Sequence, residues 1–282
     1  MKNPRRVAMP AALGLVAVAL ALGVRAVSDH YEHQFLSTGP NGPQTPMTFG
    51  APFERVGFAS GRRRLDGYLV RAPAACPSQV AVLIFHGVGE TISYWPKTQR
   101  LLYDRCIGSL VFDYSGHGES SPPGSIANLD ADATAAWAYF TARFASVRRR
   151  CAIGHSMGNG PLLASISSFV PRPACVVVAN AFSSLRALGV ADGAPAFVMS
   201  VVPDYWDNVV NVGAVRSPLL VVHSDADRVI PQAMGKQVFA AAPEPKALLI
   251  VHGFRHNAIY RQPETWWPPV IAFLRADPAA SD

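Results

Sequence analysis

The sequence predicts an α/β fold, in which a mostly parallel central sheet carries helices on both of its faces. The chain has 282 residues, a length at which α/β folds are commonly single domains. Half of these residues are apolar, which is enough to bury both faces of a sheet. Apolar runs of strand length alternate with helical stretches such as residues 126–145, as βαβ units require.

The predicted elements follow one another along the chain. Residues 53–58 and 65–70 alternate between apolar and polar side chains, which predicts an antiparallel hairpin at the start of the domain. Four later runs of largely apolar residues predict buried strands: 80–85, 150–153, 218–223 and 247–251. A helix is expected from about Pro161, closely after the strand at 150–153.

The first 26 residues predict an export segment. Lys2, Arg5 and Arg6 precede an apolar stretch at 7–24, and residues 24–26 resemble a small-residue cleavage site. A cleaved signal peptide and an uncleaved anchor in the inner membrane, formed by residues 7–24, both fit this pattern. In either case the rest of the chain is exported, to the periplasm or the cell exterior if the source is bacterial.

The segment after the export signal predicts a linker. Residues 27–52 are polar and rich in Gly, Pro, Thr and Asn. We therefore expect the folded domain at 53–276 and a short tail at 277–282.

The charge of the chain excludes one class of partner. The net charge is +6, but Lys2, Arg5, Arg6 and Arg25 of the export segment supply four of the 25 basic residues. The other 21 are nearly balanced by 19 acidic residues, so the domain has no electrostatic footprint for nucleic acid. The arginine triplets at 62–64 and 148–150 are interpreted as a solvated turn and a helix end.

Gly154-His155-Ser156-Met157-Gly158 is the most informative motif. It fits G-x-S-x-G, the nucleophile elbow, and lies between a predicted strand and a predicted helix, as that motif requires. A tight turn of this kind exposes the serine and places helix N-terminal N–H groups beside it. The flanking glycines are needed because a Cβ there would collide with the neighbouring strand or helix.

An acid and a histidine follow in the order Ser, Asp, His. Asp227 lies after the strand at 218–223, and His256 lies after the strand at 247–251. The loops at the carboxyl ends of parallel strands meet in one crevice, so the three side chains can converge. We expect Ser156 to act as nucleophile, His256 to take and return its proton, and Asp227 to orient the imidazole.

A further loop completes the predicted site. The strand at 80–85 runs directly into His86-Gly87-Val88-Gly89-Glu90, where two glycines let the backbone turn its N–H groups toward the serine. We assign the oxyanion hole to the backbone N–H groups of Val88 and Met157.

These motifs resemble the α/β-hydrolase superfamily over roughly residues 53–276. The chain is most similar to the small-lid branch that contains serine aminopeptidase-like hydrolases and depalmitoylase or monoacylglycerol-lipase relatives. Residues 111–120 resemble the D-Y-x-G-x-G-x-S turn of that branch, and 181–185 and 206–208 resemble its sequence further on. One departure is His223, where the branch commonly has Gly. The resemblance implies an α/β-hydrolase fold with a short cap.

Asp225 and His252 compete with Asp227 and His256 for the roles of acid and base. The D-x-x-[IV]-P and G-x-x-H-N patterns of the family favour Asp227 and His256. Structural roles are expected for three other histidines near the predicted turns: His86, His117 and His155.

The apolar stretch at about 182–215 predicts part of the core and a short cap over the serine. Such a cap favours acyl or other hydrophobic substrates. Tyr94 and Trp95, close after the oxyanion loop, are candidates for the pocket wall, with plain surface packing as the alternative.

Cys76 precedes the strand at 80–85, and Cys151 opens the strand at 150–153. Cys106 and Cys175 lie at the starts of two further predicted strands, so all four cysteines are at the edge opposite the crevice. The strand order that the resemblance implies places the strands of Cys76 and Cys106 side by side, and likewise those of Cys151 and Cys175. Neighbouring strands are about 4.8 Å apart, a distance that disulfides tolerate, so we propose these two pairs. Four buried thiols that act as small hydrophobes are the alternative.

The sequence therefore predicts a serine hydrolase that cleaves carboxylic esters or thioesters, with an apolar acyl group, through an acyl-enzyme on Ser156. The expected partner is a small-molecule or lipid-like ester. A peptidase with the same triad and a catalytically idle binding protein on this fold are the alternatives. No cofactor is expected, and no metal, because no His, Cys or carboxylate pair has the spacing of metal ligands.

Overall fold

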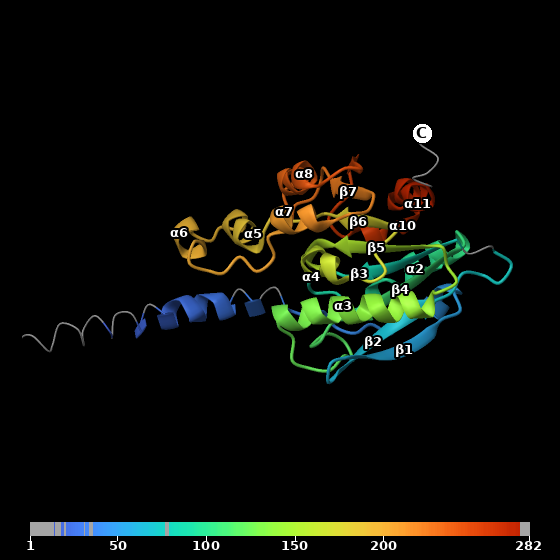
Figure 1. Ribbon diagram of the computed structural model, residues 1–282, viewed down its shortest axis with the longest axis horizontal. Coiled ribbons are helices and arrows are strands. Elements are labelled where there is room, and N and C mark those ends of the chain that lie inside the picture. Colours follow the sequence, from blue (N-terminus) through green and yellow to red (C-terminus); the bar gives the residue numbers. More distant parts are fainter. Residues whose placement is uncertain are drawn as a thin grey trace, which may run out of the picture.

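A computed structural model of the protein describes residues 36–76 and 79–276, together with residues 14, 18–19, 21–30 and 32–33 of the N-terminal region. At its centre lies an eight-stranded sheet of order β1-β2-β4-β3-β5-β6-β7-β8 (Figure 1). The strands are β1 (Glu54–Ser60), β2 (Arg63–Val70), β3 (Val80–Phe85), β4 (Ile107–Asp113), β5 (Arg149–His155), β6 (Cys175–Ala179), β7 (Leu219–Ser224) and β8 (Lys246–Val251). The pairs β1–β2 and β2–β4 are antiparallel and all the others are parallel. The predicted fold class is confirmed.

Helices and 3-10 turns connect the strands. The longer helices are α2 (Pro96–Asp104), α3 (Ile126–Arg143), α8 (Gln232–Ala241) and α11 (Pro268–Arg275). The shorter helices are α4 (Asn159–Ser165), α5 (Leu185–Ala191), α6 (Ala196–Met199), α7 (Asn208–Asn211), α9 (Ala258–Arg261) and α10 (Pro263–Trp266). The 3-10 turns are η1 (Pro46–Phe49), η2 (Ile92–Tyr94), η3 (Ser156–Gly158), η4 (Ile166–Ser168) and η5 (Val212–Ala214).

Helices cover both faces of the sheet because its strands are apolar on both faces. In β3, Leu83 and Phe85 face a core shared with α3, α4 and α8, whereas Val82 and Ile84 face a core shared with α2, α9, α10 and α11. Alternate side chains of a strand point to opposite faces, so every residue of this strand is buried. Helix α3 begins where the Ser125 hydroxyl accepts a hydrogen bond from the Asn128 N–H, which satisfies one of the unpaired N–H groups of its first turn.

Both proposed disulfides are present. Cys76 is bonded to Cys106 and Cys151 to Cys175, with Cα separations of 5.6 and 4.8 Å. Cys151 and Cys175 are opposite each other in the register of β5 and β6, which explains why neighbouring parallel strands could be bridged at this edge.

The segment predicted as a linker contacts the domain. The Ser37 carbonyl accepts a hydrogen bond from the Gly89 N–H, and the Gly42 N–H donates to the Ser93 hydroxyl. The Phe49 carbonyl accepts from Arg100 of α2. Part of this segment therefore lies against the loop that follows β3.

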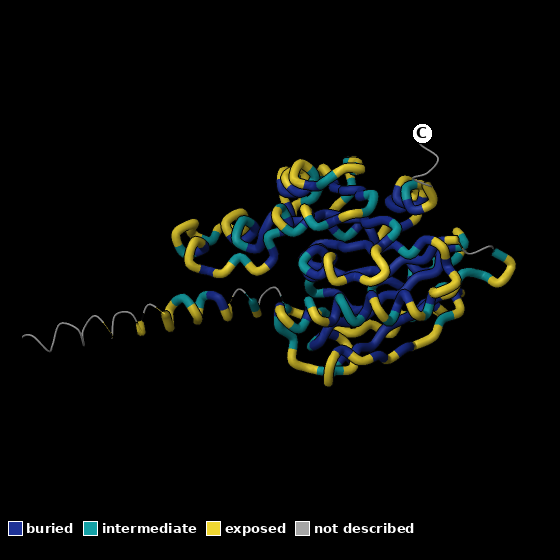
Figure 2. Tube along the Cα trace, viewed as in Figure 1, coloured by how far each residue is buried: buried dark blue, intermediate teal, exposed yellow. Residues whose placement is uncertain are grey.

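The predicted export segment lies largely outside the described residues, as does the predicted tail at 277–282. Residues 21–30 are helical and mostly exposed, whereas the central strands β3 to β7 are almost entirely buried (Figure 2). Among the residues that the structure describes, no helix has the length and apolar character needed to cross a membrane.

Candidate active site

Ser156 occupies a strained turn between β5 and α4. Its φ of 54° lies in the left-handed region, which costs a non-glycine residue on the order of 1 kcal/mol or more and is found mainly at functional sites. The turn needs glycine beside it, because a Cβ on Gly158 would lie 2.1 Å from the carbonyl oxygen of Phe85. The collision predicted from the motif is therefore real.

The structure brings the three predicted side chains into one hydrogen-bonded chain. His256 Nε2 lies 2.9 Å from Ser156 Oγ, and His256 Nδ1 lies 2.6 Å from Asp227 Oδ2. Ser156 and His256 are almost completely buried, with 4% and 9% of their surface exposed. The side chains come from loops at the carboxyl ends of β5, β7 and β8, as parallel strands predict.

Asp227 is held as an anion. Its Oδ1 accepts hydrogen bonds from the N–H groups of Val229 and Ile230, while Oδ2 faces His256. Burial opposes ionisation, but the hydrogen bond and charge of His256 and the two backbone donors together lower the pKa of Asp227 below its ordinary value. An ionised Asp227 can fix the imidazole tautomer and stabilise an imidazolium.

The competing acid and histidine form a separate pair. His252 Nδ1 lies 2.7 Å from Asp225 Oδ2, and the Gly253 N–H donates to the other oxygen of Asp225. Both side chains are exposed, and neither contacts Ser156 in the described hydrogen-bond network. The geometry therefore favours Asp227 and His256.

The predicted oxyanion loop lies beside the serine. Val88 and Met157 line the same cavity as Ser156. The Val88 N–H donates to no acceptor within the described part of the chain, so it is free to bind an oxyanion. The Glu90 carboxylate accepts hydrogen bonds from the Gly87 N–H and from the indole of Trp95, which hold the turn closed.

Comparison with known sequences identifies the family of the chain. Residues 81–245, more than half of the chain, match the sequence profile of the alpha/beta hydrolase family. This protein belongs to the alpha/beta hydrolase family.

Similar proteins were found by sequence and by structure. Over 179 residues, the chain is 28% identical to an uncharacterized protein of Mycobacterium tuberculosis, with 63% of each chain covered. It is 27% identical to alpha/beta hydrolase domain-containing protein 17B of Xenopus laevis, over 65% of this chain and 63% of that protein. The chain thus spans less than two thirds of the length of these relatives.

The solved structures share the fold at low sequence identity. The Pyrococcus furiosus esterase Pf2001 is 18% identical with a TM-score of 0.67, and 84% of this chain and 98% of that chain are covered. A thermophilic esterase from Thermogutta terrifontis is 17% identical with a TM-score of 0.61, covering 79% and 98%.

Three buried side chains, of Glu90, His155 and Asn180, connect the loops that carry the predicted site, and the sequence did not predict these contacts. His155 Nδ1 lies 3.1 Å from Glu90 Oε1, and His155 Nε2 lies 3.2 Å from the carbonyl oxygen of His256. Asn180 also donates to that carbonyl oxygen, at 2.9 Å. Burial opposes the charge of Glu90, but the interaction with His155 lowers the pKa of Glu90 below the usual range. The buried contact between Glu90 and His155 therefore joins the predicted oxyanion loop to the backbone of His256.

The other histidines have structural positions. His86 contacts the Gly87 carbonyl through Nδ1 and lies 3.4 Å from Asp113 through Nε2. Burial lowers the pKa of His117 to about 4, which keeps it neutral near pH 7. His223 Nε2 faces the Ile230 carbonyl, and its ring fills the space where a Cβ on Gly235 would lie 2.2 Å from Nδ1. The departure from the family pattern at His223 is thus matched by a glycine on α8.

A cavity of about 250 Å³ opens at Ser156 and is mainly apolar. Its lining residues are Ser37, Val88, Ser156, Met157, Phe182, Leu188, Asp192, Val229 and Ile230. The wall predicted from Tyr94 and Trp95 is wrong, because neither residue lines this cavity. Trp95 is fully buried behind the oxyanion loop, where its indole N–H is bonded to Glu90.

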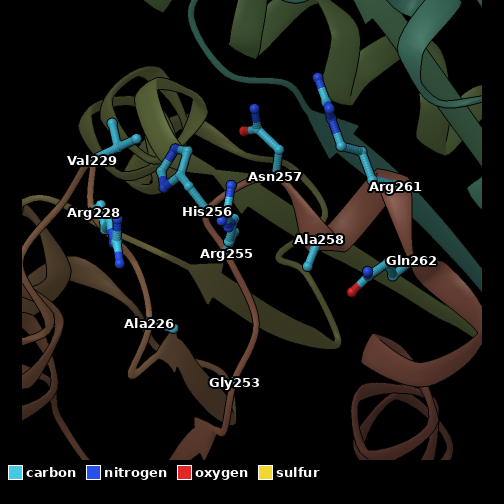
Figure 3. A pocket seen from close by; sticks show the side chains of 10 residues that line it. All are labelled: Ala226, Arg228, Val229, Gly253, Arg255, His256, Asn257, Ala258, Arg261 and Gln262. Atoms are coloured by element: carbon cyan, nitrogen blue, oxygen red, sulfur yellow. The ribbon is translucent and has the colours of Figure 1, made fainter.

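A second cavity, of about 550 Å³, is lined by His256 and by residues on either side of it in the chain (Figure 3). No group of three or more His, Cys, Asp or Glu side chains that could hold a metal ion occurs among the described residues.

Proposed function

We propose that this hydrolase cleaves carboxylic esters or thioesters through an acyl-enzyme on Ser156. The observation that carries the proposal is the hydrogen-bonded chain Ser156–His256–Asp227, which opens into an apolar cavity. A serine hydroxyl is a weak nucleophile until a base removes its proton, and His256 Nε2 is within reach of that proton.

The reaction then follows from the geometry. Ser156 Oγ attacks the carbonyl carbon while His256 takes the hydroxyl proton, and the N–H groups of Val88 and Met157 stabilise the oxyanion. His256 returns the proton to the leaving oxygen or sulfur as the bond from that atom to the carbonyl carbon breaks. Water then attacks the acyl-enzyme by the same steps, which releases the acid and restores Ser156.

The acyl group is proposed to be apolar. Phe182 lies at the end of the turn after β6, Leu188 lies on α5, and both line the cavity beside Ser156. These residues belong to the region predicted as a cap, which projects from the body of the molecule as α5 and α6 (Figure 1). An apolar lining favours burial of an acyl chain over burial of a charged group.

One observation favours a second candidate, an aminopeptidase. Asp192 is an acidic residue that lines the same cavity. A carboxylate at that position could bind the ammonium group of a peptide.

The identity of the nucleophile is tested by Ser156→Ala. We expect this variant to lose labelling by a fluorophosphonate probe and to lose about 10⁴-fold or more in ester turnover, while it stays folded. Ser168→Ala is the matched control, because Ser168 is exposed at the end of the same helical segment and should label normally. Equal labelling of the Ser156→Ala variant and the wild type would show that the nucleophile is another residue.

The substrate class is tested with p-nitrophenyl esters of increasing chain length beside an aminoacyl p-nitroanilide. We expect ester turnover to rise with chain length until the cavity is filled. Activity confined to the anilide, and lost in Asp192→Asn, would establish the aminopeptidase instead.

We also propose that the domain is exported. The basic and apolar pattern of residues 1–26 supports this, and so do the two disulfides, which persist in oxidising compartments. Cell fractionation with protease added from outside tests the proposal, and a cytosolic protein that retains Met1 would contradict it.

A further inference from the structure

The larger cavity beside His256 is lined by three arginines. Arg228 lies in the loop after β7, Arg255 directly precedes the base, and Arg261 ends α9. In Figure 3, Arg228 and Arg261 lie on opposite sides of His256, with Arg255 beside it. All three side chains are exposed to solvent, so a ligand in the cavity can reach them.

These arginines are not neutralised by the neighbouring acids. Among the described residues, no carboxylate forms an ion pair with Arg228, Arg255 or Arg261. The acids of this region have other partners. Asp227 faces His256, Asp225 faces His252, and Glu264 faces Lys97. The cavity therefore presents an uncompensated positive charge beside the catalytic base.

The positions of the two cavities beside Ser156 and His256 indicate which half of the substrate each cavity binds. The apolar cavity contains Ser156 and the basic cavity contains His256, and Val229 lines both. The base must deliver its proton from Nε2 to the leaving atom, so the leaving group departs on the side of His256. The acyl chain then occupies the apolar side.

We propose that the arginine-lined cavity binds an anionic group, a carboxylate or a phosphate, on the alcohol or thiol that leaves. This inference rests on the proposed ester or thioester hydrolysis and narrows its substrate to an apolar acyl group joined to an acidic leaving group. The chemistry is otherwise unchanged. The Ser156 Oγ–carbonyl bond forms, the bond to the leaving oxygen or sulfur breaks, and the proton of Ser156 passes through His256 to the leaving atom.

Guanidinium groups suit this role because they are always charged and bind carboxylate and phosphate oxygens through paired N–H donors. The cavity is large enough for more than the charged group alone, at about 550 Å³. Because the cavity is exposed, salt screens the attraction between its arginines and an anion. The preference for an anionic substrate should therefore depend on the salt concentration.

The test compares matched esters that share one acyl chain. The first pair is a p-nitrophenyl ester and the same ester with a carboxylate on the phenyl ring. The second pair is a monoacylglycerol and the corresponding acylglycerol phosphate. We expect kcat/KM to be higher for the anionic member of at least one pair, and the pair that responds identifies the anion. The preference should fall as the salt concentration rises.

Substitutions of the three arginines test whether these residues cause the preference for anionic esters. Replacing Arg228, Arg255 and Arg261 together by Gln should lower the ratio of anionic to neutral kcat/KM about tenfold and remove its salt dependence. Replacing all three by Lys, which keeps the charge, should restore most of the preference. Arg62→Gln is the control, because Arg62 is an exposed arginine in the turn between β1 and β2. It should leave the ratio unchanged.

Two kinds of failure are distinguishable. If the neutral esters are cleaved in a Ser156-dependent reaction but the ratio is one or less, or is the same in the triple Gln variant, this inference is overturned and the proposed function stands. If Ser156 is not labelled and no ester of either pair is cleaved, the proposed function itself fails, and the leaving-group assignment fails with it.

Discussion

Gly39 shows how the segment before the first strand influences the catalytic loop. A Cβ on Gly39 would lie 2.0 Å from the Gly89 carbonyl oxygen, and the Gly89 N–H donates to the Ser37 carbonyl. The oxyanion loop is thus held from outside by residues 37–39 and from inside by Glu90, which accepts from the Gly87 N–H. Its backbone has little freedom on either side.

We therefore expect Gly39→Ala to displace the oxyanion loop. Loss of one oxyanion donor costs about 10²–10³-fold in kcat, so a partial displacement should lower kcat by about tenfold or more with a smaller change in KM. Gly213→Ala is the matched control, because a Cβ there has no atom within 4 Å and should leave kcat unaltered. Steady-state kinetics on a p-nitrophenyl ester measure both variants. If Gly39→Ala has the same kcat as the wild type, residues 37–39 do not position the oxyanion loop.

Among single residues, the sequence predicted those whose signals are local in the chain. Ser156 is marked by its glycines, and Asp227 and His256 by their places at strand ends. Glu90 and His155 were not predicted to be joined, because their contact depends on how two loops pack in the folded chain. Trp95 was misassigned because the direction of its side chain is decided by the buried carboxylate that its indole binds.

A hydrogen bond joins the end of the cap region to α3. Trp206 is fully buried, and its indole N–H donates to Asp130 Oδ1 at 2.9 Å. Burial raises the pKa of Asp130 from 3.8 to about 6, while the hydrogen bond from Trp206 partly opposes this rise. Above pH 6 the ionised carboxylate is therefore a source of instability in the folded protein.

We expect Asp130→Asn to stabilise the protein at pH 7.5, by about 1–2 kcal/mol after allowance for partial exposure, because Asn keeps the acceptor for Trp206 without the charge. The folded pKa lies above the unfolded one, so the wild type loses stability as pH rises from about 4 to about 6. The advantage of the variant should therefore shrink as pH falls through this range. Urea unfolding at pH 7.5 and pH 4.5 measures it, with Glu119→Gln as an exposed control. If the free energies of unfolding of the variant and the wild type differ by the same amount at both pH values, the charge of Asp130 is not the cause of the difference.

The strands were predicted more accurately than the cap for a physical reason. Strands β3, β5, β6 and β7 are buried on both faces, and continuous apolar runs mark such strands. The cap has no such pattern, because Met199 and Val202 are buried whereas Phe197 and Val201 are exposed, within six residues of chain. Only its contacts in the folded protein decide which apolar residues are core.

In the molecule as a whole, the two disulfides cross-link the edge of the sheet opposite the crevice that contains Ser156. They join residues that are 30 and 24 positions apart. Loop closures of this length are each worth about 3 kcal/mol in the chain-entropy account. Their surroundings differ, because Cys151 and Cys175 are fully buried in the core whereas Cys76 and Cys106 are partly exposed.

This difference predicts an order of reduction. Thiol–disulfide exchange needs access to a sulfur, so a mild reductant should open Cys76–Cys106 in the folded protein while Cys151–Cys175 stays intact until global unfolding. Alkylation of the folded protein followed by mass spectrometry should label Cys76 and Cys106 first, and the denatured, reduced protein provides the control in which all four are labelled. Ester turnover should persist after the first step, because the crevice lies at the other end of the strands. Equal labelling rates for both pairs would contradict this order, and four free thiols in non-reduced protein from an oxidising compartment would show that neither bond forms in the cell.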